Sequence, residues 1–338
     1  MATIQEVAKR AGVSKATVSR VLSGNGYVGP QKREQVLQAI AETGYRPNLL
    51  ARNLATRTSQ TIGLVITNTL YSGSYFTEIM AHSARILEQQ GRQLILADGK
   101  HTAEQEQAAI QFLLDLRCDG IIIYPRFLSI DALDAIISRH KQPILVINRR
   151  LRINQSYCIF SDQHASSATA VNHLLAQGHR DIAFITGSPD SPTGIERLSG
   201  YRAALNLAGI EADPARIVAG KWTAQSGMAA VDRLLAHGVT FSALVASNDE
   251  MAIGAIKRLT ECQIAVPEQV SVIGFDDIPL APYITPSLSS MKLPVTEMID
   301  ETIQRLLTML DGGDWHPQAP FTASLMLRDS VAQGPGSG

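Results

Sequence analysis

From Thr61 onward, short apolar runs of strand length alternate with segments whose apolar residues recur at helical spacing. Strands that are apolar throughout are typical of parallel sheets, because helices cover such sheets on both faces. The rhythm runs to residue 147 and restarts after Phe160, which predicts an α/β fold with two similar lobes and a cleft between them. In the first lobe we expect strands at 62–66, 94–96, 120–124 and 144–147 and helices at 76–90, 104–116 and 130–140. In the second we expect strands at 182–185, 217–219, 243–246 and 270–275 and helices at 165–176, 195–208, 224–236 and 250–262, and a final helix is expected at 295–310.

A different pattern precedes the two lobes. Thr3 and Glu6 form a Thr-x-x-Glu capping box, and apolar residues then repeat at helical spacing until Gly12. Ser14 can cap a second helix. The outer face of that helix carries small, basic and hydrogen-bonding side chains, namely Lys15, Ala16, Ser19 and Arg20. Such a face suits the edges of bases in a major groove, so the pattern indicates a helix-turn-helix reader, although a generic helical hairpin with a solvated face has the same pattern.

Charge is distributed unevenly along the chain. The 338 residues carry a formal net charge of −1, which by itself argues against a nucleic-acid partner. Residues 1–60, however, hold nine basic and three acidic residues and so carry +6, which leaves −7 for the rest of the chain. A basic segment on an acidic body is typical of a phosphate-binding module attached to another domain.

Several classes of protein are disfavoured by the sequence. Cys118, Cys158 and Cys262 are odd in number and far apart, which argues against a disulfide framework or a Cys-x-x-Cys metal site and favours a reduced, cytoplasmic protein. No apolar run approaches about 18 residues and no signal-peptide core begins the chain, so we expect no membrane segment. The eight histidines are scattered, and no metalloprotease, nucleophile-elbow or phosphate-loop motif occurs. We therefore expect neither an enzyme nor a bound metal or cofactor.

Four stretches of the basic segment match motifs that occur together in a known protein family. They are TIQEVA at residues 3–8, AGVS at 11–14, TVSRVL at 17–22 and GYRPN at 44–48. They resemble the headpiece of the LacI/GalR family of bacterial repressors, and the resemblance continues to about residue 330. Within the family, the chain most resembles repressors of β-glucoside operons. Val28-Gly29-Pro30 departs from the family's usual Val-Ser before the third helix. A glycine N-cap costs only about a few tenths of a kcal/mol, so we expect this helix to form.

The resemblance implies how the chain is divided. It gives a helix-turn-helix headpiece at 1–46, a hinge helix or linker at 47–59, a two-lobed, periplasmic-binding-protein-like sensor and dimerisation domain at 60–330, and a disordered tail at 331–338. It also implies that the final helix returns to the first lobe. In the headpiece, Val36, Leu37 and Ile40 predict a third helix that Gly44 ends.

The segment after Pro47 is too short to be a stable helix alone, since isolated helices under about 12–15 residues are marginal in water. The resemblance implies a hinge helix that is ordered on the operator, with Leu54 wedged into the minor groove. The alternative is an ordinary linker with Leu54 packed on the sensor. The DNA-contacting residues that we expect are Thr3, Ser14, Lys15, Ala16, Thr17, Ser19, Arg20, Asn48, Ala51 and Leu54.

Polar side chains follow the expected strands of both lobes. These are Asn148 and Arg149, Asn248 and Asp249, and Asp276 and Asp277, with Trp222 after a further strand. Ligands of open α/β sheets lie beyond the carboxyl ends of the strands, and amides, carboxylates, an arginine and an indole face suit a sugar. Each signal has a simpler explanation: Asp249 can be a helix N-cap, and Trp222 can be a core or rim aromatic. Residues 188–193 have no phosphate-loop lysine and indicate a plain loop.

The resemblance names the effector site more narrowly. It places Arg197, Asn248 and Asp276 at ligand-contacting positions of one lobe, Asn148 at such a position of the other, and Phe160 and Trp222 at aromatic positions of the pocket. Tyr75 and Phe76 lie where family members line the cleft, or else belong to the core of the first helix of the sensor.

Three functions are compatible with these features. The first is a repressor of a carbohydrate operon that is released from a near-palindromic operator by a small sugar or sugar-phosphate inducer, and that binds as a homodimer because one headpiece contacts few bases. The second is a periplasmic-type sugar-binding protein or sugar-converting enzyme on the same scaffold, which the basic hairpin disfavours. The third is a repressor with a purine corepressor. No leucine heptad ends the chain, so nothing suggests an assembly larger than a dimer.

Overall fold

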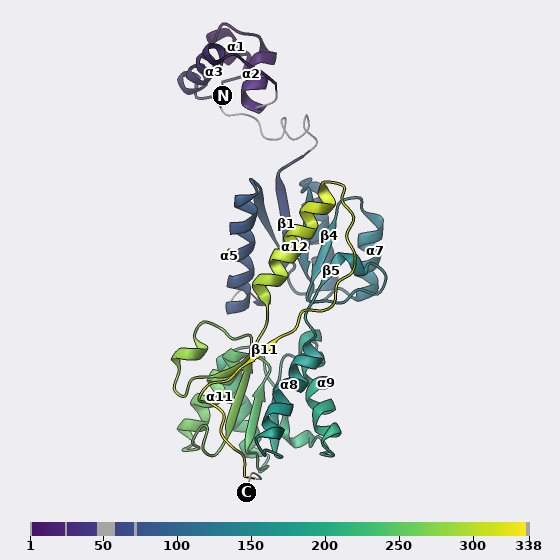
Figure 1. Cartoon of the computed structure of the whole chain (residues 1–338), viewed down its shortest axis with the longest axis vertical. Coiled ribbons are helices and arrows are strands. Elements are labelled where there is room, and N and C mark those ends of the chain that lie inside the picture. Colours follow the sequence, from purple (N-terminus) through teal and green to yellow (C-terminus); the bar gives the residue numbers. More distant parts are fainter. Residues whose placement is uncertain (1, 24–25, 46–57, 71–72, 336–338) are drawn as a thin grey trace. The chain divides into compact units, whose positions relative to one another are not determined.

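The computed structural model describes residues 2–23, 26–45, 58–70 and 73–335, which form two compact units, 1–59 and 60–338 (Figure 1). The described residues of the first unit form helices α1 (Ile4–Arg10), α2 (Lys15–Ser23) and α3 (Pro30–Thr43). The second unit contains two α/β lobes, which are the two similar lobes expected from the sequence. Within the described residues, no helix is both long and apolar enough to cross a membrane.

The three helices of the first unit enclose a small core. Val7, Val18 and Val36 are fully buried at its centre, one from each helix. The predicted capping box at the start of α1 is confirmed, because the Glu6 N–H donates to Thr3 Oγ1 at 3.3 Å and the Thr3 N–H donates to Glu6 Oε2 at 2.8 Å.

Both ends of the third helix also follow the sequence. Gly29 is its N-cap and provides no side-chain hydrogen bond, yet α3 forms as expected. Gly44 ends the helix with a φ of 61°, a left-handed conformation that glycine adopts without steric cost.

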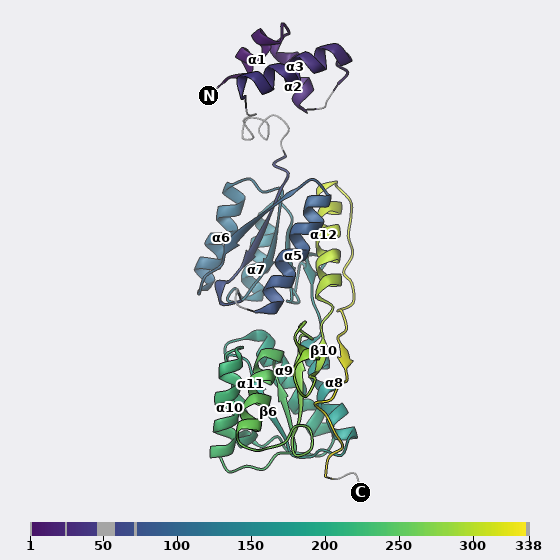
Figure 2. The same cartoon turned by 90° about the vertical axis from the view of Figure 1, so that its left-hand side faces the viewer.

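The first lobe of the second unit is a five-stranded parallel sheet in the order β2-β1-β3-β4-β5. Its strands are β1 (Thr61–Ile66), β2 (Gln93–Asp98), β3 (Gly120–Tyr124), β4 (Ile144–Ile147) and β5 (Cys158–Ile159). Helices α6 (Ala103–Asp115) and α7 (Ile130–Arg139) cover one face, and α5 (Ser74–Gln89) and α12 (Val295–Leu310) cover the other (Figure 2). Alternate residues of β1 serve the two faces, since Val65 packs in the α6–α7 core and Leu64 in the α5–α12 core.

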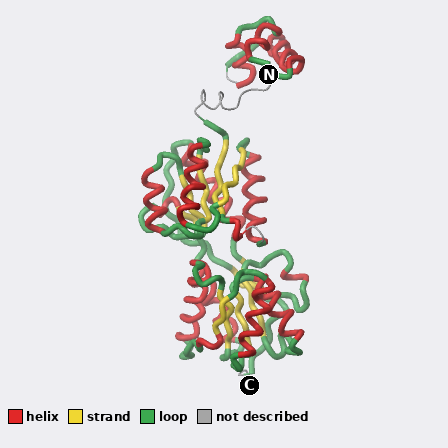
Figure 3. The backbone as a smooth tube through the Cα atoms, turned by 180° about the vertical axis from the view of Figure 1, so that it is seen from behind, coloured by secondary structure: helices red, strands yellow, loops and turns green. Residues whose placement is uncertain are grey.

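The second lobe has a six-stranded sheet in the order β11-β10-β9-β8-β6-β7, in which only the pairing of β10 with β11 is antiparallel. Its strands are β6 (Ile182–Thr186), β7 (Ile217–Ala219), β8 (Ala243–Ala246), β9 (Ser271–Phe275), β10 (Ser289–Lys292) and β11 (Ser324–Met326). Helices α8 (Gln163–Ala176) and α9 (Pro192–Leu207) cover one face, and α10 (Ala224–Ala236) and α11 (Asp249–Glu261) cover the other. In both lobes the sheet lies between layers of helices (Figure 3).

The chain passes between the lobes after β5, after β10 and again before β11. The passage after β10 carries α12 back onto the first lobe beside α5, as the resemblance implied (Figure 2). Ser161 and Phe321 form an isolated parallel bridge where two of the passages run together. Short 3-10 helices lie at Asn68–Leu70, Gln155–Tyr157, Pro214–Arg216 and Ala281–Tyr283.

The expected disordered tail from residue 331 is wrong for residues 331–334. The Ala332 N–H donates to Ser271 Oγ at 3.0 Å, and the Ala332 carbonyl accepts from Nε2 of buried His179 at 3.1 Å. The Gly334 N–H donates to the Gln177 carbonyl at 2.8 Å. This part of the chain is ordered because the start of β9 and the loop after α8 satisfy its backbone polar groups.

Candidate functional site

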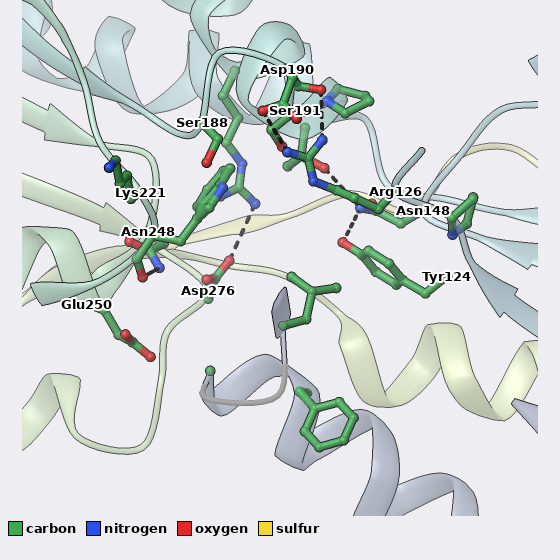
Figure 4. A pocket seen from close by; sticks show the side chains of 18 of the residues that line it. Tyr124, Arg126, Asn148, Ser188, Asp190, Ser191, Lys221, Asn248, Glu250 and Asp276 are labelled. Atoms are coloured by element: carbon green, nitrogen blue, oxygen red, sulfur yellow. Dashed lines mark hydrogen bonds and ion pairs between the residues drawn. The ribbon is translucent and has the colours of Figure 1, made fainter. Parts of the chain in front are cut away.

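A cavity of about 480 Å³ lies between the two lobes of the second unit. Small-molecule sites typically have volumes of about 300–1,000 Å³. The cavity is bordered by residues that directly follow strands, as expected for open α/β sheets. They are Tyr124 at the end of β3 and Arg126 after it, Asn148 and Arg149 after β4, residues 188–193 after β6, Lys221 and Trp222 after β7, Asn248 after β8 and Asp276 after β9 (Figure 4).

Arg197 of α9 is the most tightly held polar side chain of this cavity. It is only 2% exposed, and its guanidinium lies 4.4 Å from the centre of the Phe275 ring. Nε donates to Gln163 Oε1 at 2.9 Å, one terminal nitrogen donates to the Ser247 carbonyl, and the other lies 3.4 Å from Asp276 Oδ1. With each nitrogen bonded to a different partner, Arg197 fixes the position of the Asp276 carboxylate at the cavity wall.

Asp276 combines a charge with low solvent access. Burial raises the pKa of Asp276, and the positive charge of Arg197 opposes that rise. A carboxylate that retains its charge in such surroundings is a strong acceptor for hydroxyl groups, because a low local dielectric strengthens its hydrogen bonds.

The backbone at the cavity adopts conformations that non-glycine residues rarely adopt. Asn148 has a φ of 63°, Trp222 of 65° and Asp276 of 101°. Each such conformation costs about 1–3 kcal/mol and persists only where surrounding contacts impose it. Their concentration at the ends of β4, β7 and β9 therefore supports a ligand-binding role for this edge of the sheets.

Asn248 and Trp222 are joined by a hydrogen bond. Asn248 is the N-cap of α11, since its Oδ1 accepts from the Met251 N–H at 3.0 Å, and its Nδ2 donates to the Trp222 carbonyl at 2.9 Å. The Trp222 indole occupies the space that a side chain at Gly187 would need, because a Cβ there would lie 1.9 Å from Trp222 Cζ2. Trp222 is thus a fixed apolar wall of the cavity.

Asp249 has a structural role beneath the site. The N-cap of α11 is Asn248, so Asp249 is the first helical residue and is fully buried. Its Oδ1 accepts from Ser290 Oγ at 2.6 Å and its Oδ2 from the Ile278 N–H at 2.9 Å. Burial raises the pKa of Asp249 well above its ordinary value.

Side chains of the two lobes meet across the cavity. Asn148 Nδ2 donates to the Tyr124 hydroxyl of its own lobe at 2.6 Å and to Thr193 Oγ1 of the other lobe at 3.2 Å. Asn148 Oδ1 accepts from Gln163 Nε2 at 3.2 Å, so Gln163 connects Asn148 with Arg197.

The second connection between the lobes is an ion pair. A terminal nitrogen of Arg126 lies 2.8 Å from Asp190 Oδ1, and the other donates to the Asp190 carbonyl at 2.7 Å (Figure 4). Buried Glu106 holds the loop that carries Arg126, since its carboxylate accepts from the backbone N–H groups of residues 126–128 at 2.7–2.9 Å.

The structure brings most of the effector residues expected from the sequence to this cavity. The expected residues that line it are Phe76, Asn148, Arg149, Arg197, Trp222, Asn248 and Asp276. Tyr75 is the second residue of α5, but its side chain lies outside the described part of the chain.

The structure places Phe160 and residues 188–193 differently from what the sequence predicted. Phe160 is not among the described residues that line it; its side chain packs against the α6–α7 core, and its carbonyl accepts from the Phe321 N–H at 2.9 Å. The reason is that Phe160 lies on a passage between the lobes rather than at the mouth of the site. Residues 188–193 are more than a plain loop, because they line the cavity and supply the contacts of Thr193 and Asp190.

The polar residues at or beside the cavity that sequence reasoning missed include Tyr124, Arg126, Gln163 and Lys221. Tyr124 is the last residue of β3 and Arg126 lies two residues beyond it, much as Asn148 directly follows β4, so the strand-end argument applied to every strand would have found them. Gln163 carries no such signal, because it reaches Arg197 and Asn148 from the first turn of a helix.

The first unit presents the outer face expected for α2. Lys15, Ala16, Ser19 and Arg20 are exposed, while Val18 of the same helix is fully buried. Ser14 caps the helix, since its Oγ accepts from the Thr17 N–H at 3.1 Å, and Thr17 Oγ1 lies 2.9 Å from Ser14 Oγ. Thr3 caps α1. Asn48, Ala51 and Leu54 lie outside the described residues. Among the residues that the structure describes, no cluster of His, Cys, Asp and Glu could hold a metal ion.

Comparison with protein families and known proteins agrees on both units. Residues 3–48 match the family described as bacterial regulatory proteins of the lacI family, and residues 171–331 match the periplasmic-binding-protein-like domain. Over 331 residues the chain is 62% identical to the HTH-type transcriptional regulator AscG of Escherichia coli K12, and the match covers 98% of each chain.

Two solved structures are similar over almost the whole length. The Lac repressor dimer bound to operator and the anti-inducer ONPF is 28% identical with a TM-score of 0.89, covering 98% of this chain and 99% of the other. The complex of the transcriptional regulator CelR with cellobiose is 30% identical with a TM-score of 0.72, covering 98% and 100%. These similarities agree with the α/β fold and the amino-terminal helix-turn-helix unit.

Proposed function

Because the chain belongs to the LacI family of DNA-binding transcriptional regulators, we propose that it represses a β-glucoside utilisation operon and leaves its operator when a small sugar binds. In this function, the cavity between the lobes binds the inducer. Two copies of the chain bind one near-palindromic operator, each through α2 of its headpiece.

The chemistry of the cavity carries the proposal. Asp276 and Arg197 present a carboxylate and a guanidinium, and Asn148 presents an amide from the other lobe. These groups match the alternating donors and acceptors of a sugar ring, and Trp222 offers the flat apolar wall against which the C–H face of a sugar packs.

The relatives support a sugar of the β-glucoside class. CelR, which has a similar structure, is known in complex with cellobiose, a disaccharide of β-linked glucose. AscG, a transcriptional regulator, is 62% identical to this chain, and the sequence motifs of this chain resemble those of repressors of β-glucoside operons.

The proposed DNA contacts come from two segments. The exposed residues of α2 read the major groove, since Arg and Lys bond the O6/N7 edge of guanine and Ala packs against a thymine methyl. The segment 47–59 folds on the operator and inserts Leu54 into the minor groove, where bending allows further contacts.

A titration tests this function. The operator is first obtained by selecting DNA with the purified protein and sequencing it. Labelled operator bound to the protein is then titrated with cellobiose, salicin, arbutin and their phosphates, and with hypoxanthine and guanine. We expect at least one sugar compound to release the DNA. Release by none of them, or a purine that tightens the complex, would contradict the inducer model and favour a corepressor.

A further inference from the structure

Arg149 differs from the other arginines of the cavity because no acidic side chain compensates it. Arg126 pairs with Asp190, and Arg197 pairs with Asp276. For Arg149, no ion pair or side-chain hydrogen bond occurs within the described part of the chain, although it lines the same cavity.

The surroundings of Arg149 make this lack of a partner costly. The side chain is half-buried, and burial lowers the pKa of Arg149; Tyr124 opposes this lowering, and the nearby charge of Arg126 adds to it. A cation that has lost part of its hydration without gaining an acceptor is destabilised, and an anion bound beside it would remove that cost.

Neither nearby carboxylate can take this place. The oxygens of Glu106 already accept three backbone N–H groups from the loop at residues 126–128. Glu196 raises the pKa of Arg149 only weakly and is exposed on α9, without an ion pair to Arg149 in the part of the chain that the structure describes. Among the described residues, neither of these carboxylates compensates Arg149, so an anionic ligand can take this place.

The charges of the whole cavity lead to the same conclusion. Its wall carries four basic side chains, Arg126, Arg149, Arg197 and Lys221, and three acidic ones, Asp190, Glu250 and Asp276. Two of the acidic side chains, Asp190 and Asp276, pair with Arg126 and Arg197. The other charged side chains of the wall are two basic ones, Arg149 of the first lobe and Lys221 of the second, and one acidic one, Glu250. The cavity favours a ligand with negative charge.

The position of Arg149 connects this charge to the sugar site. Asn148 has a left-handed backbone at the end of β4, and both it and the next residue, Arg149, line the cavity. An anionic group bound by Arg149 is therefore held by the residue next to Asn148, whose amide is proposed to bind hydroxyl groups.

We propose that the effector is a phosphorylated sugar whose phosphate is bound by Arg149. This inference rests on the proposed function, because it names the class of inducer for the same site. The guanidinium has five donors in a planar fork that matches two phosphate oxygens. A neutral sugar would leave the fork unpaired, so Arg149 also discriminates against the unphosphorylated compound.

The test compares matched ligands in the full-length protein. Binding of methyl β-glucoside, its 6-phosphate, methyl β-glucuronide and inorganic phosphate is measured by calorimetry. We expect the 6-phosphate to bind about 10- to 150-fold more tightly than the neutral glucoside, the range for charge-assisted hydrogen bonds. In Arg149→Gln this ratio should fall to near one, and Arg149→Lys should retain part of it. Arg150→Gln, which changes the exposed neighbour, should keep the full ratio.

The outcomes separate this inference from the proposed function. Equal affinity for the glucoside and its phosphate, or an equal loss of both in Arg149→Gln, overturns the phosphate site and leaves the sugar-induced repressor intact. Tighter binding of the glucuronide than of the 6-phosphate also overturns it, in favour of a carboxylate. Binding of inorganic phosphate with no contribution from the sugar contradicts both. Thermal unfolding of each variant confirms that a lost ratio comes from a folded protein.

Discussion

The polar residues of the cavity act through shared hydrogen bonds rather than singly. Gln163 accepts from Arg197 and donates to Asn148, so one side chain of α8 orients residues from two lobes. Removing one partner of such a network leaves a buried donor unsatisfied, which costs about 1–3 kcal/mol. The residues at the centre of the network should therefore be the most sensitive to substitution.

Asp276→Asn tests the centre of this network. The amide keeps the size of the side chain but removes the charge that Arg197 and the proposed hydroxyls share. Loss of a charge-assisted hydrogen bond costs about 1.5–3 kcal/mol, so the inducer affinity should fall about 10- to 150-fold while operator binding stays tight. Calorimetry with the inducer and a gel shift with operator measure the two quantities.

Asp277→Asn is the matched control, because the neighbouring Asp277 pairs with Arg328 at 2.7 Å and does not line the cavity in the described part of the chain. It should retain inducer affinity. If Asp276→Asn responds to inducer like the unaltered protein, the carboxylate is not a ligand contact.

His179 provides a pH dependence of stability. It is 2% exposed; its Nε2–H donates to the Ala332 carbonyl, and Nδ1 lies 2.9 Å from Ser242 Oγ. Burial lowers the pKa of His179, so below about pH 6.5 the unfolded chain binds a proton that the folded chain does not. The contribution of this group to stability is therefore present above that pH and is lost as the pH falls through it.

His179→Gln should reduce this loss, because glutamine keeps both a donor and an acceptor but does not titrate. We expect the melting temperature to fall less between pH 7.5 and 5.5 in His179→Gln than in the unaltered protein. His316→Gln, at an exposed histidine, should leave the pH dependence unchanged. An equal fall of the melting temperature in all three proteins would show that His179 does not cause the pH dependence of stability.

At the scale of single elements, α2 is the helix whose two faces have separate tasks. Val18 is buried in the headpiece core, while Lys15 and Arg20 are exposed. Arg20→Ala should cost about 1–3 kcal/mol on the selected operator and much less on random DNA, as expected for a contact to a base edge. Lys15→Ala should weaken operator binding similarly or change the preferred base. Titrations on both DNAs measure this difference, and equal losses on the two would identify phosphate contacts instead.

The sequence was sufficient for elements whose pattern is local. The parallel strands of both lobes and the capping of α1 and α2 follow from hydrophobic runs and cap residues in single segments. It was not sufficient for β5, β10 and β11, which are only two to four residues long and owe their strand conformation to neighbours that are distant in sequence.

The residues of the site also divide into those that the sequence predicts and those that it does not. Asn148, Asn248 and Asp276 are found by the strand-end rule because the topology of a parallel sheet brings strand ends together. Gln163 and the ion pair of Arg126 with Asp190 depend on how the lobes approach each other, which no single segment encodes. The position of Phe160 on a passage between the lobes depends on the same approach.

At the scale of the whole molecule, a sugar-induced repressor requires that sugar and operator weaken each other by the same factor, typically about 5- to 150-fold. That factor is the difference in free energy with which the sugar binds the two states of the sensor. Two contacts between the lobes can contribute to that difference even when no ligand is bound. One joins Asn148 to Thr193, and the other joins Arg126 to Asp190.

The Arg126–Asp190 pair should make a small contribution to that factor. The Asp190 side chain is 66% exposed and the Arg126 side chain 13%, and an ion pair with a solvated partner contributes about 0.2–1 kcal/mol. Arg126→Ala and Asp190→Ala should therefore each weaken sugar binding by only about 1.4- to 5-fold, with no loss of operator binding in the absence of sugar. The double variant should be no weaker than Arg126→Ala alone, since Arg126→Ala already removes both the ion pair and the hydrogen bond to the Asp190 carbonyl. Asp131→Ala, which removes an exposed ion pair with Arg152 inside the first lobe, is the control and should change neither affinity.

Calorimetry and gel shifts on all four variants measure these effects. A loss from Arg126→Ala far larger than from Asp190→Ala would mean that Arg126 contacts the ligand itself, and tighter sugar binding in either single variant would mean that the pair opposes closure.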